Sequence, residues 1–369
     1  MKKEILTRII LMILVTSLTT GCIQAVNSGV ERDLNNPHDP TPTTITESYP
    51  QKNPTTDNDQ AEDERESKYV TIHGLDYCIL LTELDLSCAW LEDAQLAPLQ
   101  YMSNLEVLKL QGNHMSDLGI LAGLTNLKYL DLSNNKICDL TPLSRLTELR
   151  ELYLRDNEIT DISPLSDLEN LETLFIGYNN ISDIEPLVSL TSLRTLELGS
   201  LVSCEPPPGA GFEGVFPYNS IHDISLLSNL LSLEDLSIVG LGISDLTQLS
   251  GFNKLRRLDL MFNNISDVSP LSEFTKLEEL FLGYNEIGDI TPLSNLKNLE
   301  SLHLSYNLVC DLAPLSGLEK LRSLQAVNNN ISDITPLSSL ENLVEVVLYD
   351  NPINDWSPVA HIEIVWGRH

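Results

Sequence analysis

The sequence predicts a solenoid of stacked α/β repeats, and two observations lead to this prediction. A 22-residue unit recurs, and seven of its positions, counted from its first leucine as 0, 3, 5, 10, 13, 16 and 19, are apolar in all eleven regular copies. One copy cannot bury this apolar set alone, so neighbouring copies must stack. The spacing is that of a leucine-rich-repeat solenoid of about 12 repeats, counting a looser first copy. The copies start at Leu81 (the looser one), Leu105, Leu127, Leu149, Leu171, Leu193, Leu233, Leu255, Leu277, Leu299, Leu321 and Leu343.

Each copy should form one coil. The Leu-x-Leu at positions 3 and 5 alternates like a short strand with one buried face. Asn at position 8 ends the strand, and its amide can bond the backbone of adjacent coils. Asp at position 12 precedes Ile-x-Pro-Leu, which indicates a cap followed by a short 3₁₀ or helical turn with Pro in its first turn. We therefore expect a curved parallel sheet on the concave side and short turns on the convex side.

The first residues indicate export. Residues 1–21 combine a basic head with an apolar run from Ile9 to Leu18, which is too short to span a bilayer. The following Leu18-Thr-Thr-Gly-Cys22 resembles the lipobox of bacterial-type lipoproteins, with Thr19 where that family usually has a large aliphatic residue. The resemblance implies a lipid on Cys22 and a cell-envelope or cell-surface location. Ordinary cleavage and an uncleaved anchor are the alternatives.

The remaining chain divides by pattern. Residues 22–67 lack periodicity and are rich in Pro, Thr, Asn, Asp and Glu, which predicts a disordered tether. Residues 68–104 should form an N-terminal cap with a degenerate first repeat, and Val70–Ile72 a capping strand. The solenoid should span 105–369, interrupted by an insertion at 201–218, with a C-terminal cap from about residue 359. Cys78 and Cys88 both lie in the N-terminal cap and can join in a disulfide in an exported chain; two buried thiols are the alternative.

Composition and motifs exclude several functions. The net charge of −31 disfavours nucleic acid and anionic lipid as partners. Eleven Asp residues at position 12 are expected to be caps, and a calcium ladder is the less favoured alternative because each coil supplies one carboxylate. The sequence has no G-x-S-x-G, Walker, H-E-x-x-H or C-x-x-C motif. We therefore predict no enzyme activity, no cofactor, no metal and no small-molecule substrate.

The candidate binding residues are those that the repeat leaves free. Positions 2, 4 and 6 should face the concave side, and position 7 lies at the end of each strand. Exposed aromatic rings on a rigid sheet are favoured anchors for a protein partner. One predicted patch lies on three adjacent strands, and a second lies on the other side of the insertion. The first comprises Met261, Phe262, Phe281, Tyr284, His303 and Tyr306, and the second Tyr153, Phe175 and Tyr178.

Two alternatives remain open for these residues. The aromatic residues at position 7 could instead pack against the neighbouring coil. Phe212 and Phe216 of the insertion could fold back onto the solenoid, contact a partner, or belong to a tolerated loop without function.

The consensus L-x-x-L-x-L-x-x-N-x-I-x-D-I-x-P-L-x-x-L resembles the internalin-type repeat of bacterial surface proteins, from Leu81 to the C-terminus. It is also similar to the repeat of a eukaryotic phosphatase regulatory subunit. The first resemblance implies adhesion or receptor recognition through the concave face. We predict a non-enzymatic cell-surface protein-binding module on a lipid-anchored tether. An intracellular regulatory scaffold and a self-associating envelope protein are the alternatives.

Overall fold

The computed structural model describes residues 68–199 and 219–367. The chain divides into two compact units, residues 1–79 and 80–369. The described part of the first unit is an antiparallel hairpin of β1 (Tyr69–Ile72) and β2 (Leu75–Cys78). His73 and Gly74 form its two-residue turn with φ of 52° and 78°, the pair of positive values that suits the twist of a hairpin. The expected single capping strand is thus a hairpin.

The predicted disulfide between Cys78 and Cys88 is wrong. Cys78 is a free, half-buried thiol that lies opposite Tyr69 at the end of the hairpin, whereas Cys88 is disulfide-bonded. The sequence pattern treated residues 68–104 as one cap, but Cys78 and Cys88 belong to different compact units. Cys138 and Cys310 are also free, and both are exposed.

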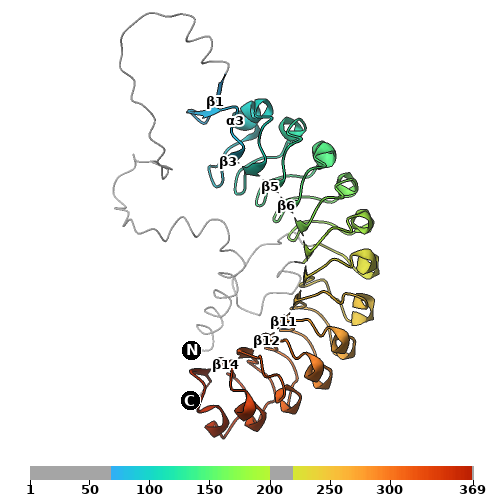
Figure 1. Ribbon diagram of the computed structural model, residues 1–369, viewed down its shortest axis with the longest axis vertical. Helices are drawn as coiled ribbons and strands as arrows, with labels where there is room; N and C mark the ends of the chain where they lie inside the picture. The colour runs from blue at the N-terminus through green and yellow to red at the C-terminus, as the bar shows by residue number, and fades with distance from the viewer. Residues whose placement is uncertain (1–67, 200–218, 368–369) are drawn as a thin grey trace, which may run out of the picture. The chain divides into compact units, whose positions relative to one another are not determined.

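The second unit contains a parallel sheet of 13 strands in sequence order, from β3 to β15. Figure 1 shows these strands lining the inner side of an arc, with the turns on its outer side. The strands are β3 (Glu83–Asp85), β4 (Val107–Lys109), β5 (Tyr129–Asp131), β6 (Glu151–Tyr153), β7 (Thr173–Phe175), β8 (Thr195–Glu197), β9 (Asp235–Ser237), β10 (Arg257–Asp259), β11 (Glu279–Phe281), β12 (Ser301–His303), β13 (Ser323–Gln325), β14 (Glu345–Val347) and β15 (Ile364–Trp366). The predicted leucine-rich-repeat solenoid is confirmed.

The outer side carries short helical elements. The only α-helix among the described residues is α3, and 3₁₀ turns follow in each coil. They are α3 (Asp93–Leu96), η1 (Ala97–Tyr101), η2 (Gly119–Leu121), η3 (Thr141–Arg145), η4 (Ser163–Leu165), η5 (Glu185–Ser189), η6 (Ser225–Asn229), η7 (Leu246–Leu249), η8 (Ser269–Glu273), η9 (Thr291–Asn295), η10 (Ala313–Leu315), η11 (Thr335–Ser339) and η12 (Ser357–Val359). Because a strand pair spans about 4.8 Å and a helical turn is wider, the stack curves with the sheet inside.

The core is the predicted apolar set. In the coil that begins at Leu277, the side chains of Leu280 and Leu282 are fully buried, as are Ile287 and Leu293 behind them. Burying one such side chain contributes about 1.5–3 kcal/mol relative to leaving it in water. Each coil shares these contacts with both neighbours, so the stability of the array depends on its stacking.

A ladder of buried Asn side chains ties the coils together. Asn285 accepts a hydrogen bond from the backbone N–H of Ile265 in the preceding coil (2.9 Å). Its amide nitrogen donates to the carbonyls of Leu260 (2.9 Å) and Leu282 (3.1 Å). Nine other coils repeat this arrangement. The remaining regular coil, which begins at Leu233, has Leu241 in place of the Asn. The predicted role of the amide at position 8 is confirmed.

The Asp row at position 12 fixes the outer turns. Asp289 accepts a hydrogen bond from the backbone N–H of Thr291 (2.8 Å), the first residue of η9. All eleven Asp residues make this bond, at 2.8–2.9 Å. Except at Asp245, the carboxylate lies one residue before the formal cap position and closes a turn of its own. The predicted N-cap is therefore confirmed at Asp245, whereas the other ten carboxylates close a turn just before the cap residue. Among the described residues, no group of acidic or Cys and His side chains could hold a metal ion.

The sheet continues without a register shift across the insertion. Strands β8 and β9 are 40 residues apart in sequence, yet Thr195 pairs with Asp235 and Leu196 with Leu236. The backbones are close here, because a Cβ on Gly199 would lie 2.3 Å from the N and O of Val239. The predicted insertion at 201–218 lies outside the described residues.

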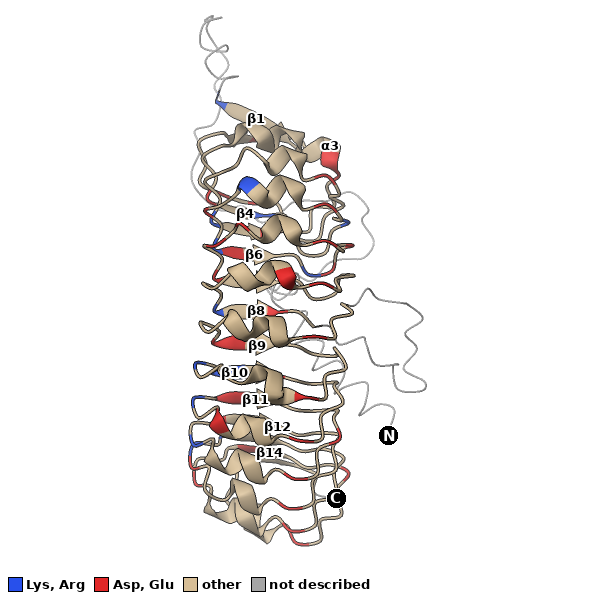
Figure 2. Cartoon of the chain, turned by 90° about the vertical axis from the view of Figure 1, so that its right-hand side faces the viewer, with Lys and Arg blue, Asp and Glu red and all other residues tan. Residues whose placement is uncertain are grey.

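An exposed charge ladder runs beside the sheet at position 1 of the coils, and the sequence patterns did not reveal it. Figure 2 shows Lys and Arg gathered mainly along one side of the solenoid, with Asp and Glu on both sides. Because these pairs are exposed, each contributes little to stability. The pairs are Lys128–Glu106 (2.6 Å), Arg150–Glu172 (2.5 Å), Arg194–Glu234 (2.6 Å) and Arg256–Glu278 (2.8 Å).

Candidate binding surface on the concave side

Three cations lie over aromatic rings on the concave face of the sheet. All six residues occupy positions 2, 4 or 6 of their coils, and we call these positions the centre of the sheet. Each cation covers a ring of the next coil, because parallel pairing places neighbouring strands side by side. The distances from the charged group to the ring centroid are 5.8 Å for Lys109 over Tyr129, 4.7 Å for Arg155 over Phe175 and 4.8 Å for Arg257 over Phe281. These contacts are cation–π interactions.

Carboxylates pair with the same three cations. Lys109 lies 3.9 Å from Asp85, and Arg155 forms an ion pair with the buried carboxylate of Glu197. Arg257 is within 3.3 Å of Asp235, 3.2 Å of Glu279 and 3.7 Å of Asp259. The centre of the sheet is therefore a set of internal cation, ring and carboxylate contacts.

The predicted patch of Tyr153 and Phe175 is part of a row of three rings. Tyr129 and Tyr153 have centroids 5.2 Å apart, and Tyr153 meets Phe175 edge to face at 5.0 Å. The Tyr153 hydroxyl donates to Glu151 at 2.9 Å. Burial and nearby carboxylates raise the pKa of Tyr129 to about 12, and burial together with this hydrogen bond raises the pKa of Tyr153 as well. Both phenols stay neutral at physiological pH.

Two predicted site residues are buried instead of exposed. Met261 is 5% and His303 is 7% accessible, so they add little open surface to the first predicted patch. They lie over Gly283, where an added Cβ would come within 3.2 Å of both side chains. Burial lowers the pKa of His303 to about 4, so the ring is neutral at physiological pH. The missing side chain at position 6 is what lets them sink into the sheet.

The other aromatic residues of that patch form a stack at the strand ends. Phe262 and Tyr284 have ring centroids 4.1 Å apart at 12°, and Tyr284 and Tyr306 are 4.2 Å apart at 11°. All three are half-buried. We call Phe262, Tyr284 and Tyr306 the aromatic rim. The position-7 rings thus pack on one another from coil to coil, which is the packing that the sequence left open as an alternative.

The rim residues have an unusual backbone. Their φ values are 56°, 58° and 59°, in the left-handed region that favours Gly, Asn and Asp. Asn134 and Asn328 occupy the same position of other coils with φ of 56° and 53°. The sequence could not reveal this strain, because only the structure shows that position 7 is left-handed in every coil where this residue is described.

The remaining predicted residues lie outside the aromatic rim. Phe281 is half-buried under Arg257 and meets His303 edge to face at 6.5 Å. Tyr178 is half-buried at position 7 with φ of 56°. Cys22, Phe212 and Phe216 lie outside the described residues.

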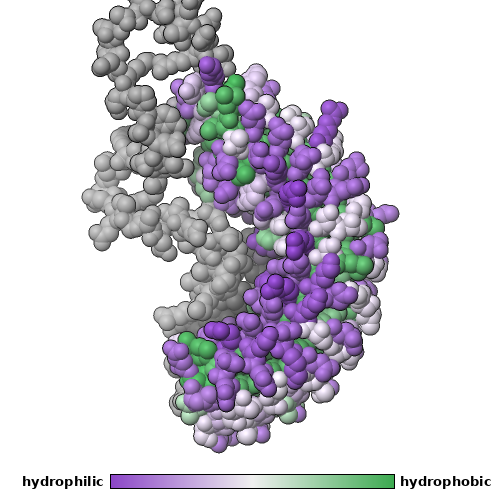
Figure 3. All heavy atoms as spheres, in the orientation of Figure 1, coloured by the Kyte–Doolittle hydropathy of each residue, from purple (hydrophilic) through white to green (hydrophobic). Residues whose placement is uncertain are grey.

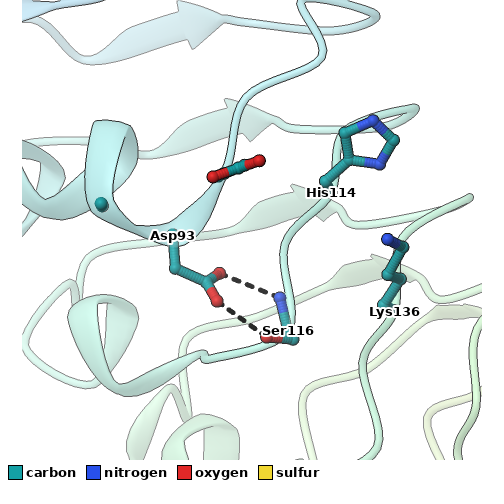
Figure 4. A pocket seen from close by; sticks show the side chains of 6 residues that line it. Asp93, His114, Ser116 and Lys136 are labelled. Carbon is teal, nitrogen blue, oxygen red and sulfur yellow. Dashed lines mark hydrogen bonds between the residues drawn. The ribbon is translucent and has the colours of Figure 1, made fainter.

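A small depression near the start of the solenoid is a second candidate. Figure 4 shows Asp93, His114, Ser116 and Lys136 around it, and Glu92 and Ala94 complete the lining. Asp93 accepts hydrogen bonds from the backbone N–H of Ser116 (2.9 Å) and from its hydroxyl (2.7 Å). These bonds join α3 to the first regular coil, so Asp93 has a structural role here.

The side of the solenoid seen in Figure 3 is mostly hydrophilic, with hydrophobic residues in small groups. Among the described residues no helix has the length and apolar composition needed to cross a membrane.

Comparison with known proteins agrees with the fold. The family model described as Leucine Rich repeats (2 copies) matches more than half of the chain, at residues 103–145, 147–187, 169–206, 253–295, 275–317 and 319–361. A comparison with curated proteins gives no significant match.

Solved structures give the same result. An internalin (inlF) from Listeria monocytogenes is 29% identical with a TM-score of 0.65, over 79% of this chain and 89% of that one. The LRR protein LIC12759 from Leptospira interrogans is 25% identical with a TM-score of 0.63, over 73% of this chain and 68% of that one. The LRR ectodomain of a receptor kinase from Arabidopsis thaliana is 19% identical with a TM-score of 0.57, over 74% of this chain and 36% of that one, and shares the fold alone.

Proposed function

The chain belongs to the leucine-rich repeat family, and we propose that it is a non-enzymatic recognition module that binds a protein partner with its concave side at the cell surface. The observation that carries this proposal is the aromatic rim beside a rigid sheet. Stacked rings lose little conformational freedom on binding and can bury much area, which makes them suitable anchors. The similarity to a bacterial internalin over most of both chains supports a recognition role.

We further propose that the module is exported and anchored through a lipid on Cys22, with residues 22–67 as its tether. The support is the basic head, the apolar run and the Gly21-Cys22 sequence. A lipid followed by a polar spacer would hold a binding domain away from the membrane. Detergent-phase partitioning of the intact protein, compared with Cys22→Ser, tests the anchor. Partitioning that does not depend on Cys22 would contradict it, and an intracellular scaffold would be favoured by an unprocessed chain in the soluble fraction.

Affinity capture from the native envelope tests recognition. The intact protein should retain a protein partner, and Phe281→Ala/Tyr306→Ala should retain much less of it, because both rings lie on the concave side or its rim. Tyr101→Ala is the matched control, since Tyr101 is an exposed aromatic residue in η1, on the outer side of the arc. Equal capture by all three proteins would refute the concave surface as the site. Retention of the chain's own copies alone would favour self-association.

A further inference from the structure

The row of position-7 residues has a distinct composition. All the described members have positive φ, and they include aromatic and acidic residues but no Lys or Arg. From the first regular coil onward the described members are Gly112, Asn134, Asp156, Tyr178, Gly240, Phe262, Tyr284, Tyr306, Asn328 and Asp350. The row therefore offers rings and carboxylates along one edge of the sheet.

The left-handed backbone of the three rim residues is energetically unfavourable. A non-glycine residue in the left-handed region costs roughly 1 kcal/mol, and Asn and Asp tolerate it better than an aromatic residue does. Stacking of the rings offsets part of this cost, by about 0.5–1.5 kcal/mol for a pair. Asn at the same position of other coils shows that the fold itself does not need a ring there. Three consecutive aromatic residues at this position thus point to a role outside the fold.

At the centre of the sheet, one Arg side chain contacts both an aromatic ring and a carboxylate. Arg257 covers the ring of Phe281 and pairs with Asp235, Asp259 and Glu279, and Arg155 does the same with Phe175 and Glu197. The row that contains the rim also holds rings and a carboxylate, because Asp350 occupies position 7 two coils beyond Tyr306 and is exposed. Asp350 is close enough to contribute to raising the pKa of Tyr306, after burial as the main cause, so its negative charge acts on the end of the ring stack.

We propose that the aromatic rim binds an arginine-bearing segment of the protein partner, with guanidinium groups stacked on Phe262, Tyr284 and Tyr306 and neutralised by the carboxylate of Asp350. This inference rests on the proposed function, because it assigns the chemistry of that partner. Arginine suits the site better than lysine, since its planar group both stacks on rings and pairs with carboxylates. The net charge of −31 attracts such a segment over a longer range.

Calorimetry with the intact protein in detergent tests the inference. The probes are short synthetic peptides of equal length in which Gly alternates with Arg, Lys or Glu. We expect the Arg peptide to bind several-fold more tightly than the Lys peptide, and the Glu peptide not to bind. The variant Phe262→Asn/Tyr284→Asn/Tyr306→Asn should weaken binding of the Arg peptide about tenfold or more, because it removes the rings.

The Asn substitutions are chosen to spare the fold. Asn is the residue that this row already carries at Asn134 and Asn328, so the left-handed backbone is kept. Tyr101→Asn is the control for loss of an exposed tyrosine, and it should bind the Arg peptide like the unmodified chain. Asn328→Tyr lengthens the stack by one ring and should strengthen binding.

Three outcomes would overturn the inference: equal binding of the Arg and Lys peptides, equal binding of the Arg and Glu peptides, or Arg-peptide binding that is unchanged in the triple Asn variant. Envelope capture separates this failure from failure of the proposed function. If the triple variant still captures the partner, recognition stands and the rim is not its site. If the unmodified chain captures no partner, the proposed function fails whatever the peptides show.

Discussion

The Asn ladder allows a prediction whose size can be worked out from single hydrogen bonds. Asn285→Leu removes the amide but keeps a side chain of similar volume, and Leu241 shows that the coil accepts Leu at this position. The backbone N–H of Ile265 then loses the Asn285 oxygen, its only side-chain partner among the described residues. An orphaned buried donor costs about 1–3 kcal/mol.

The carbonyls that Asn285 serves are affected less. Its contact with the carbonyl of Gly283 is the longest of three, at 3.3 Å, and that carbonyl also accepts from the backbone N–H of Phe262. The carbonyl of Leu260 also accepts from Asn263 (3.0 Å), and that of Leu282 also accepts from Asn307 (2.9 Å). Each keeps one hydrogen bond of two, so we assign about 0.5 kcal/mol to each loss. The expected total is about 3 kcal/mol of unfolding free energy.

Urea unfolding followed by far-UV circular dichroism measures this change. The midpoint should fall in Asn285→Leu without a change in slope, if the array still unfolds as one unit. Asn330→Ala is the control, because Asn330 is exposed and its one amide bond, to the carbonyl of Leu308, is long at 3.5 Å. The control should change stability by at most about 0.5 kcal/mol. Equal midpoints for the two variants would refute the assignment of stability to the ladder.

Three further predictions concern packing and pH. Gly177→Ala should destabilise by about 2 kcal/mol or more in the same assay, because the new Cβ would lie 2.2 Å from the carbonyl oxygen of Gly199, whereas Gly123→Ala, with nothing within 4 Å, should be near neutral. Hydrogen bonds from the turn lower the pKa of Asp289, as they do for six other Asp residues of its row. The ionised carboxylate therefore stabilises the fold above pH 4, and this stabilisation is lost as the pH falls below 4. Asp289→Asn should make the urea midpoint fall less steeply as the pH is lowered. Burial raises the pKa of Asp259 to about 6 despite the opposing charge of Arg257. The stability that comes from the protonated carboxyl is therefore present below pH 4 and is lost as the pH rises through 6. Asp259→Asn should raise the urea midpoint at pH 7 relative to the unmodified chain and leave it unchanged at pH 4.

The sequence predicted the fold because the repeat states its own periodicity. A slip of one residue in any coil would turn the leucines of positions 3 and 5 outward, so register follows from the pattern alone. The break after Gly199 was also visible, because the period lengthens there and returns at Asn219. The N-terminal hairpin was missed, since its strands are only four residues each and carry no repeat signal.

The candidate site was predicted less completely. Alternation along the strands identified which residues face the concave side, but it treats every side chain on that face as equally exposed. Met261 and His303 are buried because Gly283 leaves space beneath them, and that contact joins three coils. The stack of Phe262 on Tyr284 likewise depends on a left-handed backbone that no spacing rule gives. Such features come from neighbouring coils acting together, and a consensus describes one coil at a time.

The division between the sheet centre and the rim bears on how binding should be dissected. Removing Arg257 would take a cation from the ring of Phe281 and would leave Asp235, Asp259 and Glu279 without their shared partner. A change in binding after that substitution would mix a lost contact with new repulsion among carboxylates. Substitutions in the rim avoid this ambiguity, since exchanging a neutral ring for a neutral Asn alters no charge. Exchanges of neutral rings therefore report on the recognition surface, whereas substitution of Arg257 reports first on the balance of charges in the sheet.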